Sequence, residues 1–337
     1  MTIEKIAQLA GVSKATVSRV LNNKPDVNKA TRENILKIIA DNDFQPNAFA
    51  KAFSLQKSHS IGLIIPYEAD YIFSNPFYIE VMRGVSTEIN NRGYYLSICY
   101  PKDHNYVDMY KQKRVDGYIL MSPGSFHSHI IDSLNEVEAP FISTAHIPDY
   151  AEMISVDVDN YKGGRMLTDY LVGLGHKKIA YIGKLSVTSS TDRLHGYQDI
   201  LKENGIKPDD SLVKISNSGT SDSGYQIMKE LLAENLDITA VFAASDIMTG
   251  GIIKAVKEAG LKVPEDISVV GFDDIPGSEY ADPPLTTIKQ PAFQKGVEAT
   301  KMLIDLIEDE IEPKSKILEL ELIIRKSTGI VKSKIAE

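Results

Sequence analysis

The sequence of 337 residues has a single cysteine and no tryptophan. Cys99 cannot form a disulfide within the chain, and such sparse use of cysteine is typical of proteins from reducing compartments. No stretch of about 18 apolar residues could cross a membrane, and charged side chains interrupt the N-terminus where a secretion signal needs an apolar run. The sequence therefore indicates a cytoplasmic protein without disulfides.

Short motifs of common enzymes are absent as well. The sequence has no GxGxxG, no GxxxxGK[ST], no HExxH and no GxSxG, which argues against the enzyme classes that these motifs define. The histidines show no ligand spacing, and His127 and His129 are explained more simply as loop residues than as metal ligands. We expect no enzyme, no cofactor and no metal, although an active site assembled only in space stays the most remote alternative.

Charge is unevenly distributed along the chain. Residues 1–57 carry nine Lys and Arg against five Asp and Glu, a net charge of +4, and the remaining residues carry −13. A basic head on an acidic body suits a polyanion that contacts the head alone. Charge by itself is equally compatible with a solvated terminal domain.

The opening segment, TIEKIAQLAGVSKATVSRVLNN (2–23), predicts two short helices. Apolar residues recur at helical spacing in its first half. Gly11 suits a tight turn that needs a positive φ, and Ser13 can cap the second helix. Val17 and Val20 lie on one side of that helix, which predicts a buried face and an opposite exposed face.

Asn28 can cap a third helix, and three such helices match a helix-turn-helix unit. A helix fits the DNA major groove, where base edges present distinct donor and acceptor patterns. Arginine can grip guanine with two hydrogen bonds, while hydroxyl and amide side chains can contact phosphates. A plain helical bundle with a polar face is the alternative; the turn, the caps and the local basicity favour DNA.

The segments TIEKIAQLAGVSKATVSRVLNN, VNKATRENILKII and FQPNAFAKAFS resemble the lactose-repressor (LacI/GalR) family of bacterial transcription regulators. The likeness continues to ELIIRKSTG (321–329) and so spans nearly the whole chain. It implies that bases are read by Lys14, Ala15, Ser18 and Arg19. It also implies further DNA contacts at Ile3, Ser13, Thr16, Asn22, Asn28, Thr31, Asn47 and Ala50.

Residues 47–59 correspond to the hinge of that family, which becomes helical only on DNA. In the family a leucine from each subunit wedges into the minor groove, and apolar wedges of this kind kink the duplex. Phe53 stands at that position here, and Leu55 could take part of the role. The segment is also compatible with a disordered linker that orders only on binding. The resemblance thus predicts a DNA-binding domain over 1–46 followed by this hinge.

From residue 60 onward, apolar strands alternate with amphipathic helices. SIGLIIP, YYLSICY, VDGYILMS, APFISTA, KKIAYIG, AVFAAS and DISVVGFDD have the pattern of buried strands, which predicts parallel sheets covered on both faces. The resemblance implies that residues 60–337 form a periplasmic-binding-protein-like α/β core of two parallel-sheet lobes. We expect an N-lobe over about 60–160 and 291–321, a C-lobe over about 161–290 and 322–330, and crossovers near 159–163, 288–291 and 320–324.

A ligand is expected between these lobes, beyond the carboxyl ends of the strands. By resemblance, Arg193 in STDRLHGYQ and Asp273 in VVGFDD grip ligand hydroxyls, and their charges strengthen such hydrogen bonds. Ser245 stands where sugar-responsive relatives commonly carry asparagine, and Thr144 where some carry aspartate. The plain alternative for Arg193 and Asp273 is a salt bridge between the lobes.

The segment PYEADYIFSNPFYIEVMRGV (66–85) is longer than the usual family loop and rich in aromatic residues. Aromatic faces stack on the apolar faces of pyranose rings. We therefore expect Tyr67 and Phe77 in the pocket and other aromatic residues in the core. In this segment the chain resembles the maltose-type regulators of Gram-positive bacteria, which favours a maltose-type glucoside as the effector.

Together these features predict a homodimeric repressor of carbohydrate-utilisation genes that binds a near-palindromic operator on double-stranded DNA. The tail IVKSKIAE after KSTG is too short for a heptad-repeat tetramerisation segment, which favours a dimer. Control by a purine or by a phosphorylated carrier protein stays open, although relatives of the second kind tend to lack the arginine matched by Arg193. A transport protein would need a signal peptide.

Overall fold

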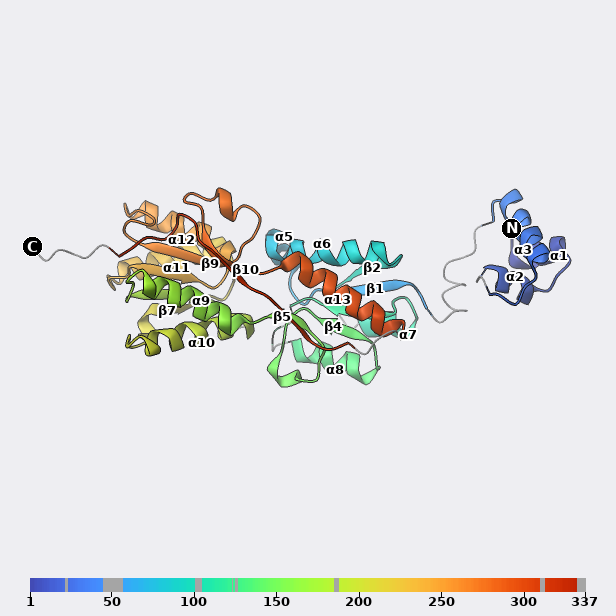
Figure 1. Cartoon of the computed structure of the whole chain (residues 1–337), viewed down its shortest axis with the longest axis horizontal. Helices are drawn as coiled ribbons and strands as arrows, with labels where there is room; N and C mark the ends of the chain where they lie inside the picture. Colours follow the sequence, from blue (N-terminus) through green and yellow to red (C-terminus); the bar gives the residue numbers. More distant parts are fainter. Residues whose placement is uncertain are drawn as a thin grey trace, which may run out of the picture. The chain divides into compact units, whose positions relative to one another are not determined.

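The computed structural model describes residues 1–21, 24–44, 57–100, 105–122, 124, 127–184, 188–309 and 313–331. The chain divides into two compact units, Met1–His59 and Ser60–Glu337. Figure 1 shows helices in the first unit and two α/β lobes in the second. Among the described residues, no helix is both long and apolar enough to span a bilayer.

The first unit, called the head below, contains α1 (Ile3–Ala10), α2 (Lys14–Leu21) and α3 (Lys29–Asp41). The Thr2 side chain caps α1 and the Asn28 side chain caps α3, each accepting from a first-turn backbone N–H. Gly11 ends α1 at a φ of +67°, a conformation that glycine adopts without strain. Capping and glycine chemistry thus fix where the helices begin and end.

The head has a small apolar core. Its buried residues come from all three helices: Ile6, Ala7, Val17, Val20 and Ile35. Since α2 contributes Val17 and Val20, which lie three positions apart, its opposite side is left to solvent. Packing therefore sets which face of α2 is available to a partner.

The N-lobe contains two parallel sheets. The larger has the strand order β2-β1-β3-β4, the smaller pairs β11 with β5, and a bridge between Ser143 and Ser155 links them. The strands are β1 (Ser60–Ile64), β2 (Tyr95–Cys99), β3 (Gly117–Leu120), β4 (Phe141–Ser143), β5 (Val156–Val158) and β11 (Lys316–Leu318). The helices are α5 (Ala69–Ser74), α6 (Pro76–Asn91), α7 (Asn105–Lys111), α8 (Ser128–Glu136), the 3₁₀ helix η2 (Pro148–Tyr150) and α13 (Ala292–Ile307).

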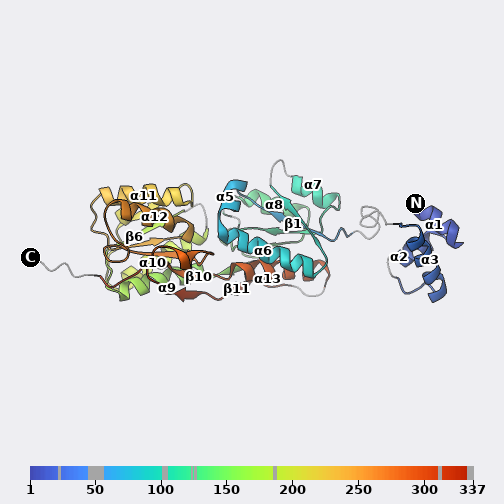
Figure 2. The ribbon, with the colours of Figure 1, turned by 90° about the horizontal axis from the view of Figure 1, so that it is seen from above.

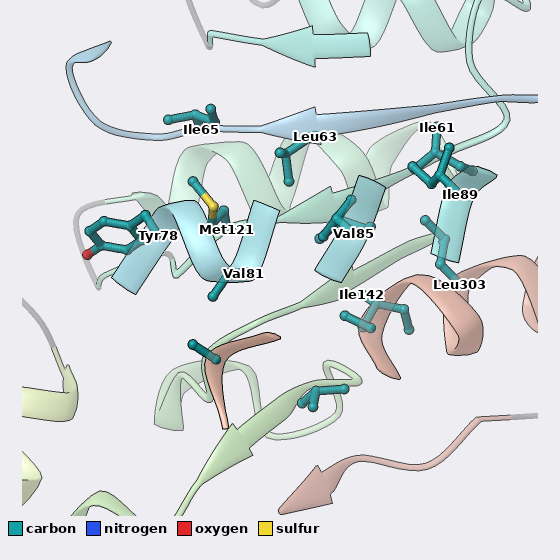
Figure 3. Packing of buried hydrophobic residues seen from close by; sticks show 14 of the residues in the cluster. Ile61, Leu63, Ile65, Tyr78, Val81, Val85, Ile89, Met121, Ile142 and Leu303 are labelled. Carbon is teal, nitrogen blue, oxygen red and sulfur yellow. The ribbon is translucent and has the colours of Figure 1, made fainter. Parts of the chain in front are cut away.

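Helices cover both faces of the larger N-lobe sheet. Ile61 and Leu63 of β1 pack in one apolar cluster with α6 and α13, whereas Ile64 packs in another with α7 and α8. Figure 3 shows the first cluster, with Val85 of α6 and Leu303 of α13 beside the strands. Successive strand side chains point to opposite faces, so an unbroken apolar run serves both clusters.

The C-lobe is built around one six-stranded sheet with the order β12-β10-β9-β8-β6-β7, in which only β12 runs antiparallel to its neighbour. Its strands are β6 (Ile179–Gly183), β7 (Val213–Ile215), β8 (Ala240–Ala243), β9 (Ser268–Asp273), β10 (Thr286–Lys289) and β12 (Glu321–Ile323). Its helices are α9 (Asn160–Gly173), α10 (Thr188–Glu203), α11 (Ser221–Ala233), α12 (Asp246–Glu258), η3 (Asp210–Leu212) and η4 (Ser278–Tyr280).

The C-lobe sheet is also covered on both faces. Ala180 and Ile182 of β6 pack with α11 and α12, while Ile179 and Tyr181 pack with α9 and α10. Figure 2 shows the pair α11 and α12 on the opposite side of the sheet from α9. This double cover leaves the strand ends as the place where polar side chains can gather.

Three segments connect the lobes: from β5 to α9, from β10 to α13 and from β11 to β12. Each lobe is therefore assembled from stretches that are distant in the sequence. The expected N-lobe boundary at 321 falls inside β12, because Glu321 already pairs with Lys289 of the C-lobe sheet. The strand pairing thus places the last crossover between Leu318 and Glu321.

Glycine allows α6 and α13 to approach closely. A Cβ on Gly296 would collide with the main-chain carbonyl of Val81, whereas a Cβ on Gly173 at the end of α9 meets nothing within 4 Å. We expect Gly296→Ala to lower the free energy of unfolding by about 2 kcal/mol or more, as overpacking does. Gly173→Ala should leave it unchanged or raise it by up to about 1 kcal/mol. Equal chemical-denaturation midpoints in the two variants would contradict this packing.

Candidate functional site

The exposed face of α2 carries the side chains expected to read bases. Lys14, Ala15 and Arg19 are exposed and Ser18 is partly exposed, while Val17 lies in the head core. Helical spacing places these four residues on one surface. A short helix with a basic face that includes small residues has the size and chemistry to enter a major groove.

Four described residues that are expected to contact phosphates lie at the starts of helices: Ser13, Thr16, Asn28 and Thr31. Ser13 Oγ accepts from the backbone N–H of Thr16 at 3.1 Å, and Asn28 Oδ1 accepts from that of Thr31 at 2.8 Å. Helix N-termini attract anions through their free N–H groups and the helix dipole. Ile3 packs against the head core and is partly buried.

Two ion pairs hold cations of the α2 face. Lys14 Nζ lies 2.5 Å from Glu4, and Arg19 Nε lies 3.3 Å from Asp26, with all four side chains more than half exposed. The hydrogen bond from Lys14 lowers the pKa of Glu4 to about 2, so this carboxylate is ionised at neutral pH. Exposed pairs add little stability, so DNA can displace both carboxylates.

The remaining predicted DNA contacts lie outside the described residues. These are Asn22, Asn47, Ala50 and Phe53, together with the second wedge candidate, Leu55. Of the hinge expected over 47–59, the structure describes only residues 57–59. The roles given to these residues stay predictions.

Asp26→Asn removes the carboxylate beside Arg19. We expect the substitution to raise the affinity for duplex DNA by about two- to fivefold. In the wild type, DNA binding must break the Arg19–Asp26 ion pair, which stabilises the free protein by a few tenths of a kcal/mol to about 1 kcal/mol. Fluorescence anisotropy at fixed salt measures this. Glu33→Gln is the matched control, since Glu33 is exposed and its substitution changes the net charge equally. Equal gains in both variants would show that net charge alone acts.

A cavity of about 90 Å³ lies between the two lobes of the larger unit. Residues that end or follow β3, β4, β6, β8, β9 and β10 line it, so it sits at the carboxyl ends of both sets of strands. Five of the six predicted ligand residues are in its wall: Phe77, Thr144, Arg193, Ser245 and Asp273. The parallel strands bring together side chains that are far apart in the sequence.

Arg193 is a fixed donor at the back of the cavity. Its guanidinium donates to Asn160 Oδ1 at 2.8 and 3.0 Å and to the carbonyl of Ala244, and it lies 3.5 Å from the centre of the Phe272 ring. Asp273 Oδ1 lies 3.7 Å from Arg193 Nη1. Both residues belong to the C-lobe, so the pair is no salt bridge between lobes, and that alternative is wrong.

Asp273 is held at the end of β9 in a backbone conformation that is rare for a non-glycine residue, with φ at +127°. Its carboxylate accepts from Ser245 Oγ at 2.6 Å and from Gln290 Nε2. Burial raises the pKa of Asp273, although nearby Arg193 opposes the shift. The strained backbone and the two donors fix the direction in which the carboxylate faces the cavity.

A second buried carboxylate supports the loop after β9. Asp246 accepts from Thr287 Oγ1 at 2.7 Å, from Ser278 Oγ at 3.0 Å and from the backbone N–H of Ile275 at 3.1 Å. Burial and the charge of Asp273 raise the pKa of Asp246 to about 7. These bonds tie α12 to the strand end that carries Asp273.

The N-lobe wall differs from the prediction at one residue. Phe77 and Thr144 line the cavity, and Thr144 Oγ1 accepts from the backbone N–H of Ser122 at 2.9 Å. Tyr67 is not in the wall, because its hydroxyl donates to the Ser122 carbonyl at 2.9 Å. Its ring lies 5.7 Å from that of Tyr71, which does line the cavity. Tyr67 therefore supports an aromatic wall rather than forming it.

Several wall residues were not predicted as ligand contacts. Lys295 and Asp157 form a buried ion pair at 2.9 Å, with Lys295 Nζ 5.7 Å from the Phe77 ring centre. Lys295 could have been noticed as a charged residue at a core position of the QPAFQKGVEA helix. Tyr71 belongs to the aromatic-rich segment 66–85, whereas no sequence signal marks Asn160, Gln290 or Lys184, which join the site only through the fold.

Two family models match the chain. The model described as bacterial regulatory proteins, lacI family, matches residues 2–47, and the model described as periplasmic binding protein-like domain matches residues 168–328. The first covers the head helices and the second covers most of the C-lobe and α13.

Curated relatives match over nearly their full length. The chain is 34% identical to the HTH-type transcriptional regulator CelR of Thermobifida fusca, over 97% of this chain and 98% of that protein. It is 36% identical to the HTH-type transcriptional regulator MalR of Clostridium butyricum, over 97% and 99%. It is 33% identical to the HTH-type transcriptional repressor PurR of Pasteurella multocida, over 97% and 98%.

Solved structures agree with these matches. A complex of the transcriptional regulator CelR with cellobiose is similar, with a TM-score of 0.75, 32% identity and coverage of 97% of this chain and 99% of that chain. A lac repressor dimer bound to operator and the anti-inducer ONPF is similar with a TM-score of 0.84, 28% identity and coverage of 98% and 99%.

Proposed function

Because the chain belongs to the lacI family of bacterial regulatory proteins and is a helix-turn-helix transcriptional regulator rather than an enzyme, we propose that it represses carbohydrate-utilisation genes under the control of a sugar. The sugar binds between the lobes, and a homodimer binds a near-palindromic operator. We place this activity in the cytoplasm, where bacterial DNA lies.

The single observation that carries the proposal is the composition of the inter-lobe cavity. Arg193 and Asp273 are fixed there as a donor and an acceptor, and Ser245 reaches Asp273 at 2.6 Å. Adjacent hydroxyls of a sugar both donate and accept, so this pair matches them. Phe77 and Tyr71 supply apolar faces on the other side, against which a pyranose ring can stack.

The DNA half of the proposal assigns roles within the head. Lys14, Ala15, Ser18 and Arg19 read base edges. The residues that contact the DNA backbone and position the head are Ile3, Ser13, Thr16, Asn22, Asn28, Thr31 and Asn47. A two-fold dimer presents two heads to two half-sites. The relative solved with operator is a dimer by its title, which supports this arrangement.

Sugar binding controls DNA binding only if it favours one arrangement of the lobes. The cavity is lined from both lobes, so a ligand that fills it contacts both. If the ligand binds one arrangement of the lobes more tightly than another, this difference in affinity is what controls operator binding. A glucose-containing disaccharide of the maltose type is the effector we favour, and a purine is the alternative, since a relative is named PurR.

The test uses the full-length protein. An operator is first selected from random duplex DNA by binding to the protein. The melting temperature of the protein is then measured with maltose, cellobiose, glucose, hypoxanthine and guanine. A ligand at about 100 times its Kd adds roughly 2.7 kcal/mol of stability, which moves the melting point by several degrees at this chain length. A shift with a sugar and none with purines is expected. A shift with a purine and none with the sugars would show that the effector is a purine and not a sugar.

Arg193→Lys tests the cavity directly. Lysine keeps the charge but lacks the planar fork that donates to Asn160 and Ala244 at once. We expect the sugar-induced melting shift and the change in operator affinity to be lost, while operator binding without sugar persists. Arg165→Lys is the matched control, because Arg165 pairs with Glu203 on the outer surface of α9 and α10. A variant at Arg193 that responds like wild type would remove this residue from ligand recognition.

The predicted minor-groove wedge has its own test. We expect Phe53→Ala to reduce operator bending, because an inserted apolar side chain unstacks a base step and kinks the duplex. Circular-permutation gel shifts or energy transfer between duplex ends measure the bend. Leu55→Ala is the comparison. A bend that persists in Phe53→Ala and is lost in Leu55→Ala would assign the wedge to Leu55.

A further inference from the structure

The charges in the cavity wall do not balance. Three cationic side chains, Lys184, Arg193 and Lys295, line the cavity together with two carboxylates, Asp157 and Asp273. Lys295 pairs with Asp157 at 2.9 Å, and Arg193 faces Asp273 at 3.7 Å. Lys184 is the third cation, and neither of the two carboxylates in the cavity wall pairs with it. Among the described residues, no carboxylate lies within ion-pair distance of its ammonium group.

Lys184 is held over neutral aromatic rings. Its Nζ lies 5.0 Å from the centre of the Tyr71 ring and 5.7 Å from that of Tyr67. It follows β6 directly, and its backbone N–H donates to Ser190 Oγ at 3.1 Å. Burial lowers the pKa of Lys184. A partly buried ammonium without a counter-charge costs free energy, whereas an anion delivered by a ligand would relieve that cost.

A second polar group of the same cavity also lacks a partner. Thr188 Oγ1 is buried and makes no hydrogen bond within the part of the chain that the structure describes. Thr188 and Ser189 line the same cavity and begin α10, whose first turn contains no acidic residue. Buried hydroxyls are normally hydrogen-bonded, so an unpaired one in a ligand cavity indicates that the ligand supplies the acceptor.

We propose that the sugar effector carries a phosphoryl group, held by Lys184, Thr188 and Ser189. This rests on the proposed function, in which Arg193 and Asp273 bind the sugar hydroxyls. An ammonium, two hydroxyls and the start of a helix offer donors from several directions. A phosphoryl group presents three acceptor oxygens and a charge near −2, which suits that arrangement better than the two oxygens of a carboxylate. Neutral tyrosines around Lys184 leave the charge of the ligand as its partner.

The experiment compares phosphorylated and unphosphorylated probes by calorimetry on the full-length protein. The probes are maltose, maltose 6′-phosphate, glucose, glucose 6-phosphate, glucuronate and inorganic phosphate. We expect a phosphorylated sugar to bind roughly 10- to 100-fold more tightly than its parent, the range set by a charge-assisted hydrogen bond. Inorganic phosphate should bind weakly, since it lacks the hydroxyls that Arg193 and Asp273 read.

Lys184→Met removes the ammonium and keeps an unbranched side chain against the tyrosine rings. It should abolish the preference for the phosphorylated sugar, measured as the ratio of the two dissociation constants, and Lys184→Arg should retain that preference. Lys254→Met is the matched control, because Lys254 Nζ lies 5.0 Å from the Tyr225 ring on the exterior of the C-lobe. The melting temperature without ligand reports whether each variant is folded.

The outcomes separate this inference from the proposed function. Equal binding of parent and phosphorylated sugar by the wild type, or a preference that survives Lys184→Met, would overturn the phosphoryl assignment and leave the sugar proposal standing. Tighter binding of glucuronate than of any phosphorylated sugar would also overturn it. If no carbohydrate of either kind binds, the proposed function fails, and this inference fails with it.

Discussion

The larger unit depends on how one buried guanidinium is satisfied. Arg193 is 6% exposed, and an arginine at such depth must find partners or destabilise the fold. Its partners come from the start of α9, the end of β8 and the end of β9. Satisfying this one side chain therefore aligns three elements of the C-lobe at the edge where the cavity opens. The ligand-facing geometry is a consequence of that alignment.

The two sides of the cavity contribute different chemistry. The C-lobe supplies fixed charges, Asp273 at the end of β9 and Arg193 in α10, and Asp246 with its three donors supports the end of β9. The N-lobe supplies aromatic surface and one neutralised ion pair, Lys295 with Asp157. The charges of the C-lobe would then set the orientation of a ligand, and the aromatic side chains of the N-lobe would bury its apolar surface. In the head, by contrast, the two cations predicted to read bases, Lys14 and Arg19, pair with exposed carboxylates.

Much of the fold could be predicted because its pattern is local. The helix caps at Ser13 and Asn28 and the turn at Gly11 follow from residue chemistry, and the seven long apolar runs became β1, β2, β3, β4, β6, β8 and β9. The strands β5, β7, β10, β11 and β12 were not predicted, because each is short and includes a polar or charged residue (VDV, VKI, TTIK, KIL and ELI). The equally short β3, β4 and β8 lie inside longer apolar runs. The unpredicted segments become strands because they pair with neighbouring strands, and their own residue pattern does not indicate it.

The site could be predicted only in part. Thr144, Arg193, Ser245 and Asp273 came from the family resemblance and Phe77 from the aromatic-rich segment 66–85, and all five line the cavity. Tyr67 was misplaced because aromatic composition does not say which ring of a cluster faces inward. Lys184 has no sequence signature, since its significance lies in the charges that its neighbours lack.

The interleaved course of the chain also bears on synthesis. The larger N-lobe sheet is complete once β4 ends at Ser143, yet part of its cover, Ala299, Leu303 and Ile304, lies in α13. A ribosome adding about 5–20 residues each second needs roughly 7 to 30 s to reach that helix. During this interval the part of the apolar sheet face that α13 covers is exposed. Exposed apolar surface of this kind is what chaperones bind. The interleaved order of the two lobes along the chain therefore leaves part of the N-lobe core incomplete for most of synthesis.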